Sequence, residues 1–151
     1  MQLYLSLLIF ILLDISNKTQ LRSKPIQKAM YCILDYFFII FHLALVIFNL
    51  FGWTWKKTRM ANLVVLLLTG GSWFILGLFY GIGYCPLTDW HWQVLTMLGN
   101  MPTETSYIQY LMARVFGLHF GIRLVDMVTL IMFLVALAVS VTMNIRDFKR
   151  R

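Results

Sequence analysis

The side chains best able to do chemistry are seven polar residues set beside long apolar runs. They are Asp35, Cys85, Asp89, His91, His119, Arg123 and Asp126. Burying a charge in lipid costs about 2.5–3.5 kcal/mol, so such groups are expected to pair or to line a cavity. Two interpretations stay open. Asp35 and Asp126 could pair with Arg123 and set the register of the helices, or the group could form a functional pocket.

The two cysteines allow two kinds of chemistry. Cys32 and Cys85 are too few for a disulfide framework or a zinc cluster. If both lie outside the membrane, a disulfide between them would tie the first apolar run to the following loop, although the sequence does not define their separation. A catalytic thiol is the other option, but no histidine or lysine adjoins either cysteine in the sequence.

The three histidines do not form a metal or haem signature. His42 and His119 are expected to differ in membrane depth by about 15 Å, which is a poor arrangement for a haem held by both. Asp89, His91 and His119 could approach one another, but they lack the ligand spacing of known metal motifs. The sequence therefore predicts no metal site and identifies no cofactor.

Apolar helices must position these side chains. Sixty per cent of the residues are hydrophobic and 13% are charged, whereas soluble domains are about half apolar and a quarter charged. A membrane span needs about 20 apolar residues, which residues 30–51, 61–81 and 122–143 supply. We predict an all-α membrane bundle with three main spans, or four if the N-terminal apolar run also crosses.

Contacts between the first two spans can be predicted from their small and polar residues. His42 is expected to be a buried imidazole that bonds to Thr69 or Ser72 at similar depth. Gly77 and Gly81 are four residues apart and would let another helix approach closely, most simply the first span.

The chain divides at about residue 30. Residues 30–151 are predicted to form the helical membrane domain, and residues 1–29 an N-terminal segment of uncertain status. The apolar run 3–13 is short for a span and lacks the basic start of a signal peptide. It is either a short apolar helix or a consequence of a start placed upstream of the native one.

Lys and Arg residues predict the orientation. Cations cluster in the loop after the first span and in the C-terminal tail, which places both in the cytoplasm of a bacterial inner membrane and residues 82–121 outside. Four cations before the first span oppose this orientation, namely Lys18, Arg22, Lys24 and Lys28. The net charge of +7 comes from cations that cluster beside the apolar runs, as they do at the ends of membrane spans. We therefore expect lipid and not nucleic acid as a partner.

The outer loop is predicted to contain two short helices. The first spans about 89–98, with Thr88 as N-cap and Gly99 as its end. The second spans about 104–116 and stops at Gly117. One face of the second helix is apolar and could lie along the membrane interface or pack on the spans; it carries Tyr107, Ile108, Leu111, Met112 and Val115.

Four sequence features together resemble a known family. The run Gly81-Ile-Gly-Tyr-Cys85-Pro-Leu-Thr88 follows a span, Phe41-His42 lies in the first span, Ser72-Trp73 in the second, and Ser106-Tyr-Ile-Gln-Tyr110 in the loop. This pattern, over about residues 30–143, resembles a bacterial family of small membrane proteins catalogued as a domain of unknown function. The resemblance implies a fold and a location but no activity.

Two functional hypotheses follow. The first is a non-enzymatic membrane component that assembles with another membrane protein or with copies of itself, since the chain carries no recognised catalytic motif. The alternative is an envelope enzyme or small-ligand protein, for a lipid, quinone or metal, with a pocket at the outer leaflet formed by the seven polar residues.

Overall fold

A computed structural model describes the backbone of residues 2–150 and the side chains of residues 24–150. Within the described backbone every regular element is a helix, as predicted, and a π-helical turn (η1) interrupts the second span. The elements in chain order are α1 (Gln2–Phe51), α2 (Arg59–Gly71), η1 (Ser72–Leu76), α3 (Gly77–Tyr80), α4 (Pro86–Met97), α5 (Tyr107–Phe116) and α6 (Ile122–Lys149).

Three helical stretches are long and apolar enough to cross a membrane, and each contains or nearly coincides with a predicted span. They are Lys24–Phe51, Arg59–Tyr80 and Ile122–Lys149. Much of their apolar surface points outward; for example, Leu78 is 82% exposed and Phe79 is 79% exposed. Such a surface is costly in water and suited to lipid. The protein is therefore a membrane-embedded helical bundle.

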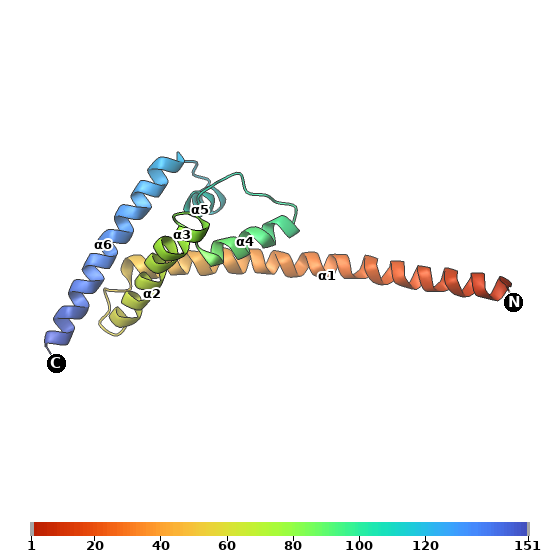
Figure 1. Cartoon of the computed structure of the whole chain (residues 1–151), viewed down its shortest axis with the longest axis horizontal. Coiled ribbons are helices and arrows are strands. Elements are labelled where there is room, and N and C mark those ends of the chain that lie inside the picture. Colours follow the sequence, from red (N-terminus) through yellow and green to blue (C-terminus); the bar gives the residue numbers. More distant parts are fainter. Residues whose placement is uncertain (1, 151) are drawn as a thin grey trace.

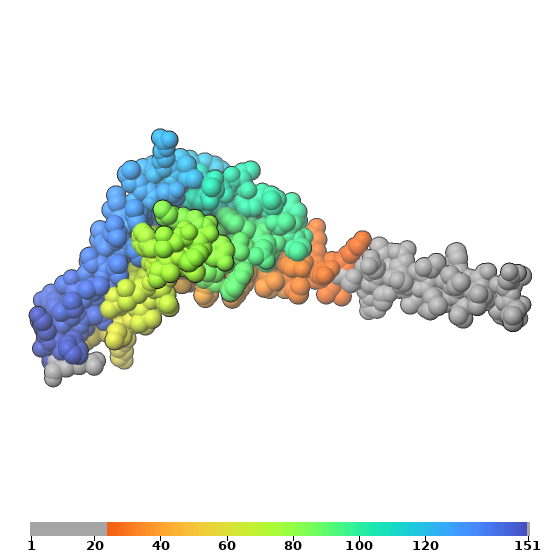
Figure 2. Space-filling model, in the orientation of Figure 1, coloured from red at the N-terminus to blue at the C-terminus, as the bar shows by residue number. Residues whose placement is uncertain are grey.

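The long helix α1 is the support on which the other elements are arranged (Figure 1). The chain turns after α1 and returns through α2, η1 and α3. Helix α4 then lies along α1, and α6 runs steeply past the C-terminal end of α1. Contacts join α1 to α4, α2 to α6 and α5 to α6. The space-filling view shows α4 and α5 packed into one mass with the start of α6 (Figure 2).

Two apolar cores hold the bundle together. One joins α1, α4 and α5 through Ile39, Leu95, Tyr107, Tyr110 and Leu111. The other joins α2 to α6 through Leu66, Phe133 and Ala136. A Cβ atom at Gly70 would lie 3.1 Å from the Phe133 ring, so this glycine permits the close approach of the two spans. The face of α5 that carries Tyr107 and Leu111 thus packs on other helices, one of the two predicted alternatives.

The N-terminal region differs from the expectation of a separate short helix. α1 continues from Gln2 to Phe51 through Pro25, with no break near residue 30. The side chains of residues 1–23 lie outside the described part of the chain, so the status of residues 1–29 as a separate segment stays a prediction.

The two loop helices exist, but both begin elsewhere than predicted. α4 starts at Pro86, with Cys85 and not Thr88 as its N-cap, because proline suits the first helical position, where no backbone N–H is needed. α5 starts at Tyr107 rather than at 104. Their ends agree with the prediction, since Gly99 (φ 77°) and Gly117 (φ 67°) adopt the left-handed conformation that terminates a helix.

Candidate functional site

A sharp return of the chain after α3 brings Cys85 back to α1. Gly81 (φ 106°) and Gly83 (φ 88°) allow the turn. Two bonds close it over the π-helical turn: the Gly83 N–H donates to the Trp73 carbonyl at 3.2 Å, and the Ser72 hydroxyl donates to the Tyr84 carbonyl at 2.8 Å. The turn also explains Gly77, where an added Cβ would meet the Ile82 backbone at 3.2 Å.

The predicted role of Gly77 and Gly81 in packing against the first span was therefore wrong. Gly81 has no atom within 4 Å of an added Cβ, and the neighbour of Gly77 is the returning chain. The glycines serve a turn because the helix ends at Tyr80, before the small-residue pair can form a continuous helical face.

The polar side chains of α1 face α4 on one stripe. Asp35, Phe38, Ile39 and His42 are spaced by three or four residues, so they share a face of the helix. All four are buried. The ring of His91, from α4, stacks on Phe38 with centroids 5.3 Å apart, which places the imidazole between α1 and α5.

Three side chains form a continuous hydrogen-bonded chain across three helices. The Nε2 atom of His91 lies 2.8 Å from Oδ1 of Asp35, and its Nδ1 lies 2.7 Å from the hydroxyl of Tyr107. The side chain of His91 is fully buried, and that of Asp35 is 6% exposed. Because an ionised carboxylate only accepts, His91 donates from Nε2 to Asp35 and accepts at Nδ1 from the Tyr107 hydroxyl.

Burial determines the protonation states of His91 and Tyr107. It lowers the pKa of His91 and outweighs the hydrogen bond and charge of Asp35, which raise it; Arg114 lowers it further. Burial also raises the pKa of Tyr107, so its phenol keeps its proton. A neutral imidazole has one N–H and one lone pair, which is what the two hydrogen bonds require. On the other carboxylate oxygen of Asp35, Arg114 lies 3.7 Å away.

His42 forms a second polar cluster about two helical turns from Asp35 along α1. Its Nε2 lies 3.9 Å from Sγ of Cys85 and 3.5 Å from the hydroxyl of Thr88. The ring of Tyr107 covers the imidazole with centroids 4.1 Å apart. Tyr107 thus contacts both histidines, and the two clusters share one aromatic wall.

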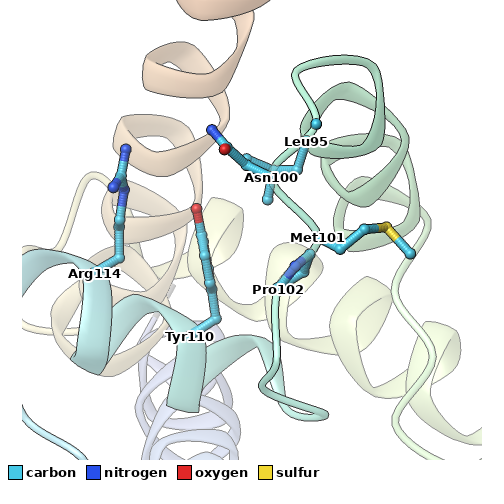
Figure 3. A pocket seen from close by; sticks show the side chains of 7 residues that line it. Leu95, Asn100, Met101, Pro102, Tyr110 and Arg114 are labelled. Carbon is cyan, nitrogen blue, oxygen red and sulfur yellow. The ribbon is translucent and has the colours of Figure 1, made fainter.

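A hollow of about 410 Å³ opens beside the buried chain. Figure 3 shows the side chains of Arg114 and Tyr110 pointing the same way from α5, while the side chain of Asn100 extends toward them from the loop after α4. Its lining residues are Leu95, Gly99, Asn100, Met101, Pro102, Tyr110 and Arg114. The hollow combines apolar walls with three polar tips, as ligand sites commonly do.

The structure divides the seven predicted site residues. Asp35 and His91 meet directly, and Cys85 lies in the neighbouring cluster. Asp89 bonds to Gln93 on its own helix at 3.3 Å. The other three are exposed at or before the start of α6, namely His119, Arg123 and Asp126.

Two expected partnerships are replaced by others. Asp35 pairs with His91 and Arg114 instead of Arg123, because α4 and α5 pack over α1 at the level of Asp35. His42 bonds to neither Thr69 nor Ser72. Thr69 instead bonds to Asn49 and to the Val65 carbonyl, and Ser72 bonds to the returning turn.

The predicted option of a Cys32–Cys85 disulfide is not realised, since both thiols are free. Cys85 lies beside His42, and ten helical residues separate His42 from Cys32, a rise of about 15 Å along α1. Among the described residues, no group of three or more His, Cys, Asp and Glu side chains could hold a metal ion.

Sequence reasoning missed Tyr107, Thr88 and Arg114 as site residues. Tyr107 was assigned to an apolar face and Thr88 to a cap. The available signal was the spacing of Tyr107, Tyr110 and Arg114, which places two hydroxyls and a guanidinium on one side of α5.

Comparison with known proteins gives one match. Neither a curated protein nor a solved structure matches the chain. A family model described as "Protein of Unknown function (DUF2784)" matches residues 32–145. The match begins before Asp35 and extends past Arg114, so it covers both clusters and the hollow. The chain belongs to this family of proteins of unknown function.

Proposed function

We propose that the protein is a membrane component that binds a phosphate-bearing lipid headgroup in the hollow beside α5. The observation that carries this proposal is the position of Arg114. Its side chain is 49% exposed and lies 3.7 Å from the buried carboxylate of Asp35. A cation is thus held at the rim of the hollow, with about half of its side chain open to a ligand.

The hydrogen bonds among Asp35, His91 and Tyr107 support a role in ligand binding rather than in catalysis at His91. Both nitrogens of His91 already have partners, and its side chain is fully buried. A general base must reach the proton that it abstracts, directly or through one water. His91 therefore braces α4 and α5 against α1, and this brace preorganises the hollow.

The polar groups of the hollow suit a phosphate. A guanidinium offers five N–H donors in a planar fork that matches phosphate oxygens. The Tyr110 hydroxyl and the Asn100 amide add donors on the same side (Figure 3). Burial raises the pKa of Tyr110, so its hydroxyl remains a donor at neutral pH. A volume of about 410 Å³ accommodates a headgroup rather than a whole lipid.

Exposed apolar side chains beside the hollow favour lipid over a free anion. Met97 is 67% exposed and Met101 is 72% exposed, and Met101 also lines the hollow. Flexible methionines adapt well to acyl chains. Following the Lys and Arg distribution, we place the hollow on the outer side of a bacterial inner membrane and the C-terminus in the cytoplasm.

Native mass spectrometry of the purified full chain with added phosphatidylglycerol tests the proposal. We expect one lipid bound per protein molecule, and an affinity for the lipid that is at least about tenfold lower in Arg114→Ala. The matched control is Arg123→Ala, which removes an exposed arginine outside the hollow and should bind as the wild type does. Equal binding by Arg114→Ala would refute the proposal. Displacement of the lipid by equimolar inorganic phosphate would identify free phosphate as the ligand and refute the lipid assignment.

Assembly with a further membrane helix is a second candidate, favoured by a separate feature of α6. A shallow hollow of about 240 Å³ lies on this span, lined by Ala138, Val139, Thr142 and Met143. Small residues one turn apart let helix backbones approach closely. Ala138→Leu should fill this hollow and reduce any dimer seen in mild detergent; an unchanged oligomeric state would argue against this role.

A further inference from the structure

We infer that Cys85 is a nucleophilic thiol that accepts an acyl group from a membrane-borne thioester, with His42 as its base. This inference does not rest on the proposed function, because Cys85 and His42 do not line the hollow beside α5. It rests on the contacts around His42, on the place of Cys85 at the start of α4, and on the apolar turn that precedes it.

Two proton donors lie beside the imidazole of His42. Nε2 is 3.9 Å from the Cys85 thiol and 3.5 Å from the Thr88 hydroxyl. Both neighbours can donate a proton, and in the tautomer with its lone pair on Nε2 the imidazole can accept the proton of the thiol. Nδ1 has no partner among the described residues, and the side chain is 4% exposed. In this tautomer the buried imidazole directs its lone pair toward Sγ of Cys85.

The start of α4 stabilises negative charge at Cys85. Cys85 is the N-cap residue and makes no side-chain capping bond. Pro86 has no N–H, and the first helical hydrogen bond runs from the Asp89 N–H to the Cys85 carbonyl at 3.1 Å. The N–H groups of Leu87 and Thr88 thus have no carbonyl four residues earlier in the helix. A helix N-terminus stabilises a thiolate, and free N–H groups there can hold an oxyanion.

The turn before Cys85 provides an apolar surface for an acyl chain. Ile82 is 90% exposed, Phe79 is 79% exposed and Leu78 is 82% exposed. These side chains lie at the end of the second span, next in sequence to the half-buried Cys85. A long-chain acyl group on Sγ would extend over them, which makes a hydrophobic donor the fitting substrate class.

The chemical step is a thioester exchange. The Cys85 thiol transfers its proton to Nε2 of His42, and Sγ attacks the carbonyl carbon of the donor thioester. The carbonyl oxygen takes up the negative charge near the Leu87 and Thr88 N–H groups. The donor's carbon–sulfur bond then breaks, and its thiolate leaves with the proton from His42. The products are acyl-Cys85 and a free donor thiol, with no net oxidation.

Intact-protein mass spectrometry tests the inference directly. The full chain in detergent micelles is incubated with a palmitoyl thioester of N-acetylcysteamine. We expect one added palmitoyl group, removed by neutral hydroxylamine and absent in Cys85→Ser. Cys32→Ser is the matched control and should react as the wild type does. His42→Gln should slow the reaction tenfold or more. The inference is overturned if no adduct forms, if Cys32 reacts as fast as Cys85, or if His42→Gln reacts at the wild-type rate.

A second measurement needs no variant and so does not depend on the folding of His42→Gln. The two thiols of the wild-type chain are labelled with N-ethylmaleimide between pH 6 and 8, and their rates are compared by peptide mass spectrometry. An unassisted thiol loses about tenfold in rate per pH unit below its pKa of about 8.5. Cys85 should lose much less than this, since His42, Thr88 and Tyr107 face it and His42 accepts its proton. Parallel pH profiles for Cys32 and Cys85 would overturn the inference.

Discussion

Polar side chains have different hydrogen-bond partners at the two ends of the bundle. At the end where α4 and α5 pack on α1, side chains bond to one another across three helices, and His91 is fully buried. At the end where α1 turns into α2, side chains bond mainly to nearby carbonyls. The Thr58 hydroxyl donates to Gly52 at 2.7 Å, and Nε of Arg59 donates to Trp53 at 3.0 Å. A single change should therefore disrupt the first end and only weaken the second.

Removal of His91 should produce the largest effect. His91→Ala leaves the buried carboxylate of Asp35 with only Arg114, 3.7 Å away. Leaving a buried charged acceptor without its hydrogen-bond donor typically costs about 3 kcal/mol or more. We expect a loss of that size in the free energy of unfolding, measured by circular dichroism in a titration with denaturing detergent. A loss below about 1 kcal/mol would show that the buried chain does not hold this end together.

The double variant Asp35→Leu/His91→Leu sharpens this result. Replacing both partners of a buried hydrogen bond by apolar residues can be nearly neutral, because the carboxylate is removed together with its donor. The double variant should therefore be more stable than His91→Ala. If it is less stable, the cost arises from shape and packing rather than from the unpaired charge.

The contrast also shows what the sequence could predict. The spans and the helix ends at Gly99 and Gly117 follow from local composition and from the conformational freedom of glycine, and these were predicted correctly. The pairing of Asp35 with His91 joins residues 56 positions apart. It depends on how α4 lies along α1, which follows from a return over η1 that local patterns do not encode.

Packing also explains why the sequence alone could not place Cys85 beside His42. Its position beside His42 depends on Pro86 starting α4 and on the positive φ angles of Gly81 and Gly83. Each is a local feature, but the direction in which together they send the backbone toward α1 depends on the packing of the whole fold. Residue types thus singled out Asp35, His91 and Cys85 as candidates, whereas packing determined their contacts.

Tyr107→Phe should produce the next largest effect. The substitution keeps the ring that packs on both histidines but removes the hydroxyl 2.7 Å from Nδ1 of His91. An unpaired buried acceptor costs about 1–3 kcal/mol, and we expect a loss of that size in the same unfolding titration. Tyr110→Phe is the matched control, since its hydroxyl faces the open hollow and can be replaced by water. Equal losses in both variants would contradict the assigned hydrogen bond.

The pH dependence of stability should be smaller and has a defined sign. Burial lowers the pKa of His91 below the ordinary value of about 6.5. Below pH 6.5 the unfolded chain therefore binds a proton that the folded protein does not, and stability falls as the pH falls. Unfolding titrations at pH 7.5 and 5.5 should show this loss.

Two glutamine variants assign the pH effect to a residue. His91→Gln retains an N–H donor toward Asp35 but cannot titrate, so the difference between the two pH values should shrink. His119→Gln removes an exposed histidine and should leave the difference unchanged. If instead stability rises on acidification, His91 is charged in the folded state, and the neutral imidazole assigned above is wrong.

The smallest effect is expected at the turn between α1 and α2. Arg59 and Asp147 form an ion pair at 2.9 Å, with side chains 20% and 23% exposed. Pairs that water reaches contribute about 0.2–1 kcal/mol and are screened by salt. Asp147→Asn should cost about that much at low salt and less at 0.5 M NaCl. Lys149→Gln, an exposed change on the same helix, serves as control. A loss above about 3 kcal/mol would mean that this end depends on Arg59–Asp147 as strongly as the other end depends on Asp35–His91. The two ends would then not differ as proposed.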